Sequence, residues 1–292
     1  MRLVFHLGAH GTDDGLIAGW IASNRSAFEQ QDMIAPPPRL FLNRLSQVLD
    51  AERDTDPLQR EEALLRGLGA SGRCRWLAVS APGLIGASSD VITEQGFYVK
   101  DVARRLYALR SFFPRSQITV LLAVRRASGF LSAILPDDPE AAPALMPMLD
   151  GETLPWAQLV VAIRRHMPQA RLVVWRHEDL GAVWPDVLAQ LTRPNSALPP
   201  TGLLDFANLT LSQEARLRLR RYLAVNTPTT AGQLRKLAAV FAERYGPAPR
   251  PHQRDDLPGW TAHEFERLDR GYGTEWDDIV GTQGVEVLLP HP

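Results

Sequence analysis

Short, continuously apolar runs recur along the first two thirds of the chain, and segments with helical periodicity separate them. Such runs predict strands buried on both faces, because a strand covered by helices carries few polar side chains. The runs are Leu3–Leu7, Trp76–Ser80, Ile118–Val124 and Leu172–Trp175. Strands that alternate with helices are typical of a parallel sheet. The pattern therefore predicts an α/β fold with three layers, α/β/α, around a central parallel sheet of four or five strands.

The intervening segments place apolar residues three and four positions apart, as helices do. After the first strand, the stripe consists of Leu16, Ile17, Trp20, Ile21 and Phe28. Further helices are predicted over about 39–50, 57–68, 101–113, 159–166 and 183–191. From about Leu211 the pattern is purely helical, which predicts helices over roughly 211–222, 229–245 and 261–278.

The linkers of the C-terminal third are short, so we expect its helices to pack on the sheet. This predicts an α/β core over 1–205 and a helical cap over 206–292. The segment Leu135–Pro155 holds five prolines and several acidic residues. A stretch of this kind is typical of a surface loop, and we expect it to form a lid.

Composition narrows the class of protein. The net charge is −1, which argues against a nucleic-acid partner held by global attraction to phosphate. The longest clear apolar run, Ile118–Val124, is far shorter than the roughly 18 residues of a membrane span. Cys74 is the only cysteine, which excludes an internal disulfide and a cysteine-based zinc cluster. We expect a cytoplasmic protein without a metal, a nucleic-acid partner or a membrane span.

The turn after the first strand is the first candidate for chemistry. It reads Gly8-Ala9-His10-Gly11-Thr12-Asp13-Asp14-Gly15 and leads into a helix. A glycine loop at a helix N-terminus presents backbone N–H groups to an anion. The sequence does not match the Walker pattern, which needs Lys followed by Ser or Thr. Asp13 and Asp14 stand where an N-cap is expected, so the favoured interpretation is that the protein's own carboxylates take these N–H groups.

The turn resembles the phosphosulfate loop of bacterial sulfotransferase-like proteins, in which a strand ends in Gly-x-His-Lys-Thr-Gly-Thr-Thr. Matching residues are Gly8, His10 and Thr12. Gly11 stands in the position of the lysine and Asp13 in that of the following glycine, while Asp14 and Gly15 replace the two threonines.

Three further stretches, within residues 1–192, follow in the order of that family. Val120–Arg125 resembles the strand whose final arginine holds the 3′-phosphate of the cofactor. Ser132 is the nearest match to the serine that holds the same phosphate, although the family spacing falls on Ala133. Leu172–Leu180 resembles the last core strand with its Glu-Asp-Leu turn, and Trp76–Ser80 resembles the second.

The resemblance implies a P-loop NTPase-like fold and transfer of a sulfuryl group from 3′-phosphoadenosine 5′-phosphosulfate to a hydroxyl of a small molecule or glycan. It implies cofactor binding by the loop residues named above together with Arg125 and Ser132. The general base would be His10, the nearest titratable group, or more distantly His177.

Departures from the family leave the activity open. The loop lysine is missing, and so is an acidic base after Ser80, where Ala81 and Pro82 follow. A carboxylate beside a phosphate costs roughly 4 kcal/mol at ~4 Å and an effective dielectric constant of about 20. The alternative to an enzyme is therefore a non-catalytic binding or scaffold descendant of the same fold, with an occluded phosphate loop.

Other polar groups have simpler interpretations. His6 and His10 do not converge on one metal, and His6 is interpreted as a satisfied core histidine. The cluster His177–Asp179 is interpreted first as a polar turn closing a strand. Arg125 and Arg126 fit anion binding and a simple strand end equally well. The arginines of 216–221 are interpreted as a solvated helix face.

Overall fold

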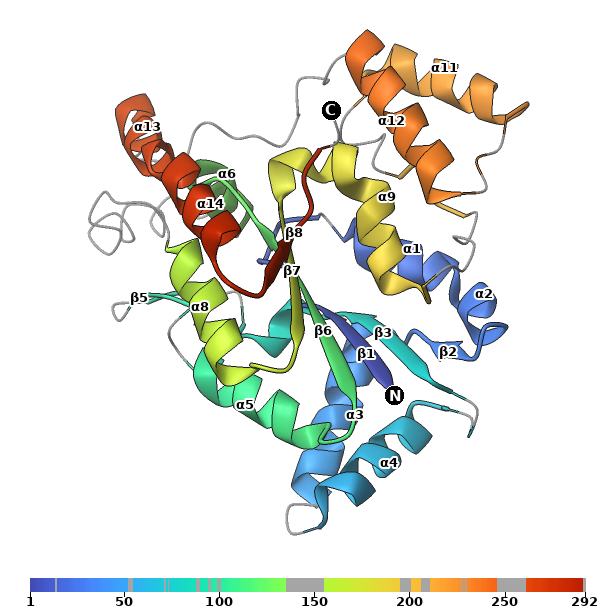
Figure 1. The fold of residues 1–292 in the computed structure, drawn as a ribbon, viewed down its shortest axis with the longest axis vertical. Helices are drawn as coiled ribbons and strands as arrows, with labels where there is room; N and C mark the ends of the chain where they lie inside the picture. Colours follow the sequence, from blue (N-terminus) through green and yellow to red (C-terminus); the bar gives the residue numbers. More distant parts are fainter. Residues whose placement is uncertain are drawn as a thin grey trace.

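Six parallel strands form the central sheet of a computed structural model of the protein (Figure 1). Their order is β2 (Met33–Ile34), β3 (Trp76–Ser80), β1 (Arg2–His6), β6 (Gln117–Val124), β7 (Arg171–Arg176) and β8 (Val285–Val287). The structure describes residues 1–13, 15–51, 55–70, 72, 74–87, 90–93, 96–98, 101–134, 155–194, 201–205, 211–226, 228, 230–245 and 261–290.

The predicted fold class and all four predicted strands are confirmed. The sheet has six strands rather than four or five, because it includes the edge strands β2 and β8. These strands contain two and three residues, which is too few for an apolar run to identify them.

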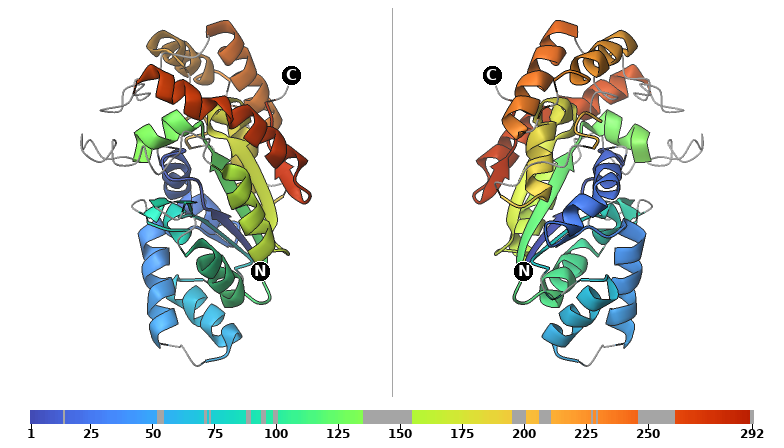
Figure 2. Two further views of the ribbon diagram at one scale, coloured as in Figure 1. Left: turned by 90° about the vertical axis from the view of Figure 1, so that its left-hand side faces the viewer. Right: turned by 90° about the vertical axis from the view of Figure 1, so that its right-hand side faces the viewer.

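Helices cover both faces of the sheet, and alternate side chains of each strand serve the two layers (Figure 2). In β1, for example, Leu3 and Phe5 face one core and Val4 the other. The first core is completed by α3 (Pro38–Ala51), α4 (Pro57–Gly67), α5 (Val102–Phe112), α8 (Trp156–His166) and α14 (Tyr272–Gly281). The second is completed by α1 (Leu16–Ser23), α2 (Arg25–Glu29), α9 (Leu180–Leu191) and α12 (Ala231–Tyr245).

Most predicted helices are present, and two are divided. Seven predicted helices correspond, in chain order, to α3, α4, α5, α8, α9, α11 (Gln213–Leu223) and α12. They were expected over 39–50, 57–68, 101–113, 159–166, 183–191, 211–222 and 229–245. The first stripe is interrupted at Asn24, whose side chain donates to the carbonyls of Trp20 and Thr201, both at 2.8 Å. The last predicted helix is divided at Gly271 into α13 (Ala262–Arg270) and α14.

The C-terminal residues contribute to the sheet as well as to its cover. β8 pairs with β7, and the side chains of Arg171 and Glu286 join the two strands, with Nη2 and Oε1 2.6 Å apart. α11 and α12 lie at the end of the molecule opposite α3 and α4 (Figures 1 and 2). The domain boundary at 205/206 stays a prediction, since residues 206–210 lie outside the described residues. The predicted lid also lies outside them, apart from Pro155.

Two smaller elements complete the part that surrounds the site. The strands β4 (Ile92–Thr93) and β5 (Gly96–Phe97) form an antiparallel pair, and α6 (Ala127–Ile134) follows β6. Among the described residues, no helix has the length and apolar character to cross a membrane.

Candidate functional site

The candidate site lies at the carboxyl end of β1, between β3 and β6. The chain leaves β1 towards α1 on one face of the sheet, whereas α5, which precedes β6, covers the other face. A crevice at such a switch in connection direction is the usual ligand position in parallel α/β proteins. The loop that the sequence singled out begins at this point.

Backbone donors in the first half of the loop are already used by β6. The N–H groups of Leu7 and Gly8 donate to the carbonyl of Leu121 at 3.0 and 3.4 Å, and that of Ala9 donates to Ala123 at 3.1 Å. The loop therefore continues the sheet before it turns. Within the described part of the chain, the N–H groups of Gly11, Thr12 and Asp13 have no hydrogen-bond partner, so these are the donors that remain for a ligand.

Asp13 acts on the helix that follows the loop. Its Oδ2 accepts the N–H of Ile17 at 2.9 Å, while its carbonyl accepts the N–H of Leu16 at 2.9 Å. The side chain is buried. The expectation that an aspartate of this loop takes up a helix N–H group is confirmed for Asp13, and Asp14 lies outside the described residues.

Gly11 lies against the helix α6 and could not carry a side chain in this position. Its φ is +68°, and a Cβ built on it would lie 2.6 Å from Cβ of Ala133. The carbonyl of Gly11 accepts a hydrogen bond from Nη1 of Arg125, whose side chain is buried. Arg125 thus reaches the loop as expected, and its guanidinium holds the loop backbone.

His177 reaches the same loop from the turn after β7. Its Nδ1 contacts the carbonyl of Thr12, and because a carbonyl only accepts, Nδ1 carries the proton. The hydroxyl of Thr12 donates to the carbonyl of Ala9 at 2.6 Å. These two bonds fix the loop on either side of Gly11.

His10 is hydrogen-bonded to Tyr98. The hydroxyl oxygen of Tyr98 lies 2.8 Å from Nδ1 of His10 and accepts its backbone N–H at 3.1 Å. Burial lowers the pKa of His10, and a hydrogen bond to the backbone of Gly86 only partly opposes this effect. Burial raises the pKa of Tyr98, so its phenol stays protonated and donates to Nδ1. The lowered pKa favours the neutral ring of His10, whose Nδ1 is engaged by Tyr98.

His6, interpreted from the sequence as a satisfied core histidine, is satisfied on one side only. Its Nδ1 lies 2.8 Å from Oγ of Ser80, and its ring stacks on Trp175 with centroids 5.8 Å apart. Among the described residues, Nε2 has no partner although the side chain is fully buried. A Cβ on Gly8 would lie 3.0 Å from this nitrogen, so Nε2 is directed towards the loop. Burial lowers the pKa of His6, with a smaller opposing effect from Asp13.

The serine that meets an anionic group is Ser128, not Ser132. The hydroxyl of Ser132 donates to the carbonyl of Ser128 at 2.8 Å within α6. Ser128, at the start of the helix, donates its N–H and its hydroxyl to the carboxylate of Asp269, at 3.0 and 2.6 Å. The serine that was matched to the family's phosphate contact is thus bonded within α6, and the serine one turn before it is held by a carboxylate of α13.

Further carboxylates meet backbone N–H groups at this edge of the sheet. Glu178 accepts the N–H of Arg126 at 3.0 Å and the hydroxyl of Tyr272 at 2.9 Å. Glu275 accepts the N–H of Ala157, in the first turn of α8, at 2.8 Å. Burial raises the pKa of Tyr272, and the charge of Glu178 raises it further. The phenol therefore stays protonated and donates its hydrogen bond to Glu178.

The turn His177–Asp179 closes β7 as a polar turn, with Arg176 Nε 2.7 Å from Asp179 Oδ2. The described residues contain no group of histidine, cysteine and acidic side chains arranged to hold a metal. Sequence reasoning missed Ser128, Asp269, Tyr272 and Glu275. Nothing in the local sequence signals them, because their partners lie far away along the chain.

Comparisons with known proteins add little to this geometry. No protein-family model matches the chain, and no curated protein matches it. Among solved structures, the crystal structure of a sulfotransferase from Alicyclobacillus acidocaldarius matches with 13% identity and a TM-score of 0.37, covering 82% of this chain and 96% of that one. At this identity and TM-score the likeness supports no conclusion on activity.

Proposed function

We propose that the protein is a non-catalytic binding or scaffold protein whose phosphate loop is occupied by its own groups. The observation that carries the proposal is the hydrogen bond from the Ile17 N–H to the Asp13 carboxylate. In an anion-binding loop, this end of the helix faces the ligand. Here it faces a buried side chain of the loop itself.

The residues present do not fit 3′-phosphoadenosine 5′-phosphosulfate in this arrangement. A phosphate near the start of α1 would be repelled by the negative charge of Asp13. The helix N-terminus stabilises a nearby anion by only about 0.3–1 kcal/mol, or up to ~2 kcal/mol when the site is partly buried. The lysine that the family carries has no room at Gly11, given the 2.6 Å approach to Ala133.

Carboxylates from the C-terminal helices support the same proposal. Asp269 and Glu275 take N–H groups of α6 and α8, and Tyr272 holds Glu178. Hydrogen bonds that N–H groups donate to ionised carboxylates are among the stronger ones in proteins. They fasten α13 and α14 over the carboxyl edge of the sheet, so the N–H groups of α6 and α8 at this edge serve to hold the fold.

A second candidate function is sulfuryl transfer to a hydroxyl acceptor. Two observations favour it: Arg125 lies beside the loop, and the N–H groups of Gly11, Thr12 and Asp13 have no partner among the described residues. This function requires that the Asp13 carboxylate leave the Ile17 N–H and that Arg125 release the carbonyl of Gly11.

Binding of 3′-phosphoadenosine 5′-phosphate separates the two functions. A ligand that binds only the native state raises its stability by RT ln(1 + [L]/Kd), so binding would appear as a thermal shift. Because the Asp13 carboxylate lies in the loop, we expect the wild type to show no thermal shift and no calorimetric heat with this nucleotide. A micromolar Kd would instead establish that Asp13 turns away and would favour the transferase.

The variant Asp13→Gly restores the family residue and tests whether the carboxylate closes the loop. We expect it to gain nucleotide binding relative to the wild type. Asp56→Gly is the matched control, because Asp56 also caps a helix, through the N–H of Leu58 at 3.1 Å, but at α4, away from the loop. A gain of binding in both variants, or in neither, would contradict the proposed role of Asp13.

A further inference from the structure

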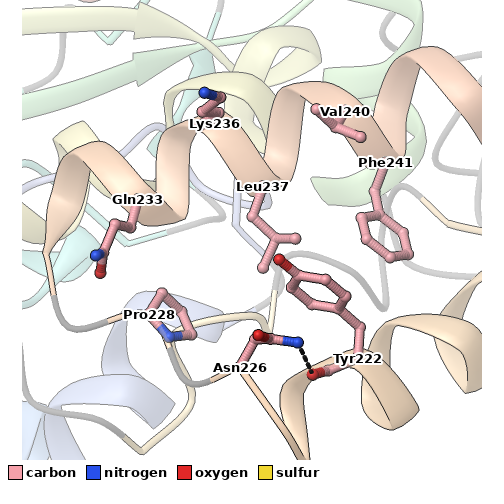
Figure 3. A pocket seen from close by; sticks show the side chains of 8 residues that line it. All are labelled: Tyr222, Asn226, Pro228, Gln233, Lys236, Leu237, Val240 and Phe241. Atoms are coloured by element: carbon pink, nitrogen blue, oxygen red, sulfur yellow. Dashed lines mark hydrogen bonds between the residues drawn. The ribbon is translucent and has the colours of Figure 1, made fainter.

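The helices α11 and α12 meet through a small apolar core of their own and leave a pocket beside it. The core consists of Leu211, Ala215, Leu219 and Phe241. The pocket has a volume of about 540 Å³ and lies between the end of α11, the connection to α12, and α12 itself (Figure 3). Ligand pockets for small molecules span roughly 300–1,000 Å³. The size therefore fits one small organic molecule.

Apolar side chains form most of the pocket wall. Tyr222 comes from α11, while Leu237, Val240 and Phe241 come from α12, where their spacing places them on neighbouring positions of one helix face. The rings of Tyr222 and Phe241 lie 6.2 Å apart at 62°. Tyr222 and Val240 are each 47% exposed, so a ligand would remove apolar surface from water.

The charge of the pocket is positive. Among the described residues that line it, Lys236 is charged and none is Asp or Glu. Within the described residues, Lys236 has no ion pair and no hydrogen bond. Residues 211–245 contain seven basic and two acidic side chains, a net charge of +5 in a chain whose net charge is −1. An anionic group at the pocket would meet this field and an available ammonium group.

We propose that this pocket binds a small amphipathic anion, with its aromatic or aliphatic body against Tyr222 and Phe241 and its acidic group on Lys236. In the described part of the pocket, apolar walls, the ammonium group of Lys236 and the lack of an acidic side chain match a carboxylate, sulfonate or sulfate ester of a hydrophobic molecule. The aliphatic side chains Leu237 and Val240 contribute nothing to recognition of a nucleic-acid backbone, which makes that occupant less suitable. The site goes beyond the proposed function and does not depend on the state of the phosphate loop.

Two fluorescent probes that differ in charge test the ligand class on the full chain. The first is 8-anilinonaphthalene-1-sulfonate, and the second is N-phenyl-1-naphthylamine, which lacks the sulfonate. We expect saturable binding of one sulfonate probe per chain. Lys236→Met should weaken its affinity about tenfold, the loss of a single charge-assisted contact, and should leave the uncharged probe unchanged. Arg244→Met is the matched control, since it removes the same charge from α12 at a residue that does not line the pocket.

A second variant tests the wall. Val240→Asp places a carboxylate in the pocket and should reduce affinity for the sulfonate probe more than tenfold. Val280→Asp, at a 42% exposed valine of α14, should leave it unchanged. If Val240→Asp does not retain the circular dichroism of the wild type, Lys236→Met alone decides.

Three results would overturn the inference. The first is an unchanged affinity of Lys236→Met for the sulfonate probe, and the second is a loss of affinity in Arg244→Met equal to that in Lys236→Met. The third is a dimer, detected by sedimentation, that Val240→Asp dissociates, because a second copy of the chain would then cover the pocket. Nucleotide titration keeps this inference separate from the proposed function. A wild type that binds 3′-phosphoadenosine 5′-phosphate without displacing the probe would refute the closed loop and leave the pocket in place.

Discussion

The carboxylate of Asp269 accepts both donors of Ser128, the backbone N–H at 3.0 Å and the hydroxyl at 2.6 Å. Asp269 belongs to α13 and Ser128 to α6, and these two helices lie far apart along the chain. An N-terminal N–H group of α6 is thereby satisfied by a side chain from another element. The pair links the C-terminal helices to the carboxyl edge of the sheet.

Loss of this link should lower the stability of the whole fold. We expect Asp269→Ala to reduce the free energy of unfolding by about 1–2 kcal/mol, the usual cost of removing a carboxylate from a helix N-terminus. Urea denaturation followed by circular dichroism measures the change. Asp277→Ala, at an exposed residue of α14, is the control and should stay within about 0.5 kcal/mol of the wild type. Equal stability of Asp269→Ala and wild type would show that this hydrogen bond contributes nothing.

Gly11 should tolerate no side chain. We expect Gly11→Ala to destabilise the fold by roughly 2–4 kcal/mol, since a left-handed backbone and a contact inside van der Waals distance both oppose the methyl group. Gly15→Ala isolates the first effect, because Gly15 has φ +76° and no described residue within 4 Å of its Cβ position. This substitution should cost about 1–2 kcal/mol.

The contact between Gly11 and Ala133 can be tested by a double-mutant cycle. Combining Gly11→Ala with Ala133→Gly removes the methyl group that the new Cβ would meet. The pair should recover the steric part of the loss and leave the conformational part. Strict additivity of the two substitutions would show that the loop does not lie against α6.

Stability should fall as the pH is lowered below neutrality. Burial lowers the pKa values of His6 and His10 below the ordinary value of 6.5. Below about that pH the unfolded chain binds more protons than the folded one, so the free energy of unfolding decreases, by up to about 1.4 kcal/mol per pH unit for each histidine. Above the unfolded pKa this contribution is fully present.

Urea denaturation at pH 7.5 and pH 5.5 measures this dependence. His10→Gln should flatten it, because glutamine does not titrate, whereas His263→Gln, at an exposed histidine of α13, should not change it. A wild type that is equally stable at both pH values would contradict the lowered pKa values of His6 and His10.

The local sequence pattern predicted the fold. It also drew attention to the site residues that come directly after a strand. Continuous apolar runs identified β1, β3, β6 and β7, because a strand buried on both faces cannot alternate. Arg125 was named as a phosphate contact by resemblance, and His177 as the more distant candidate base. Each follows a strand that ends at this edge of the sheet, and both contact the loop backbone.

The remaining features depend on contacts that no local pattern records. The approach of Gly11 to Ala133 and the capping of α6 and α8 by Asp269 and Glu275 each join residues far apart along the chain. His6 was interpreted as satisfied because a polar residue in a buried strand normally is. That its Nε2 has no partner among the described residues follows only from the three-dimensional surroundings of the ring, which include Gly8 and Trp175.

The place of β8 at the edge of the sheet has a consequence for synthesis. During translation, β7 leaves the ribosome before residues 177–284, and β8 follows only after them. Until β8 arrives, the outer edge of β7 exposes unpaired backbone groups, and such an edge promotes pairing between nascent chains. Truncation before Val285 should therefore increase aggregation of newly made protein, even though every group of the candidate site is present.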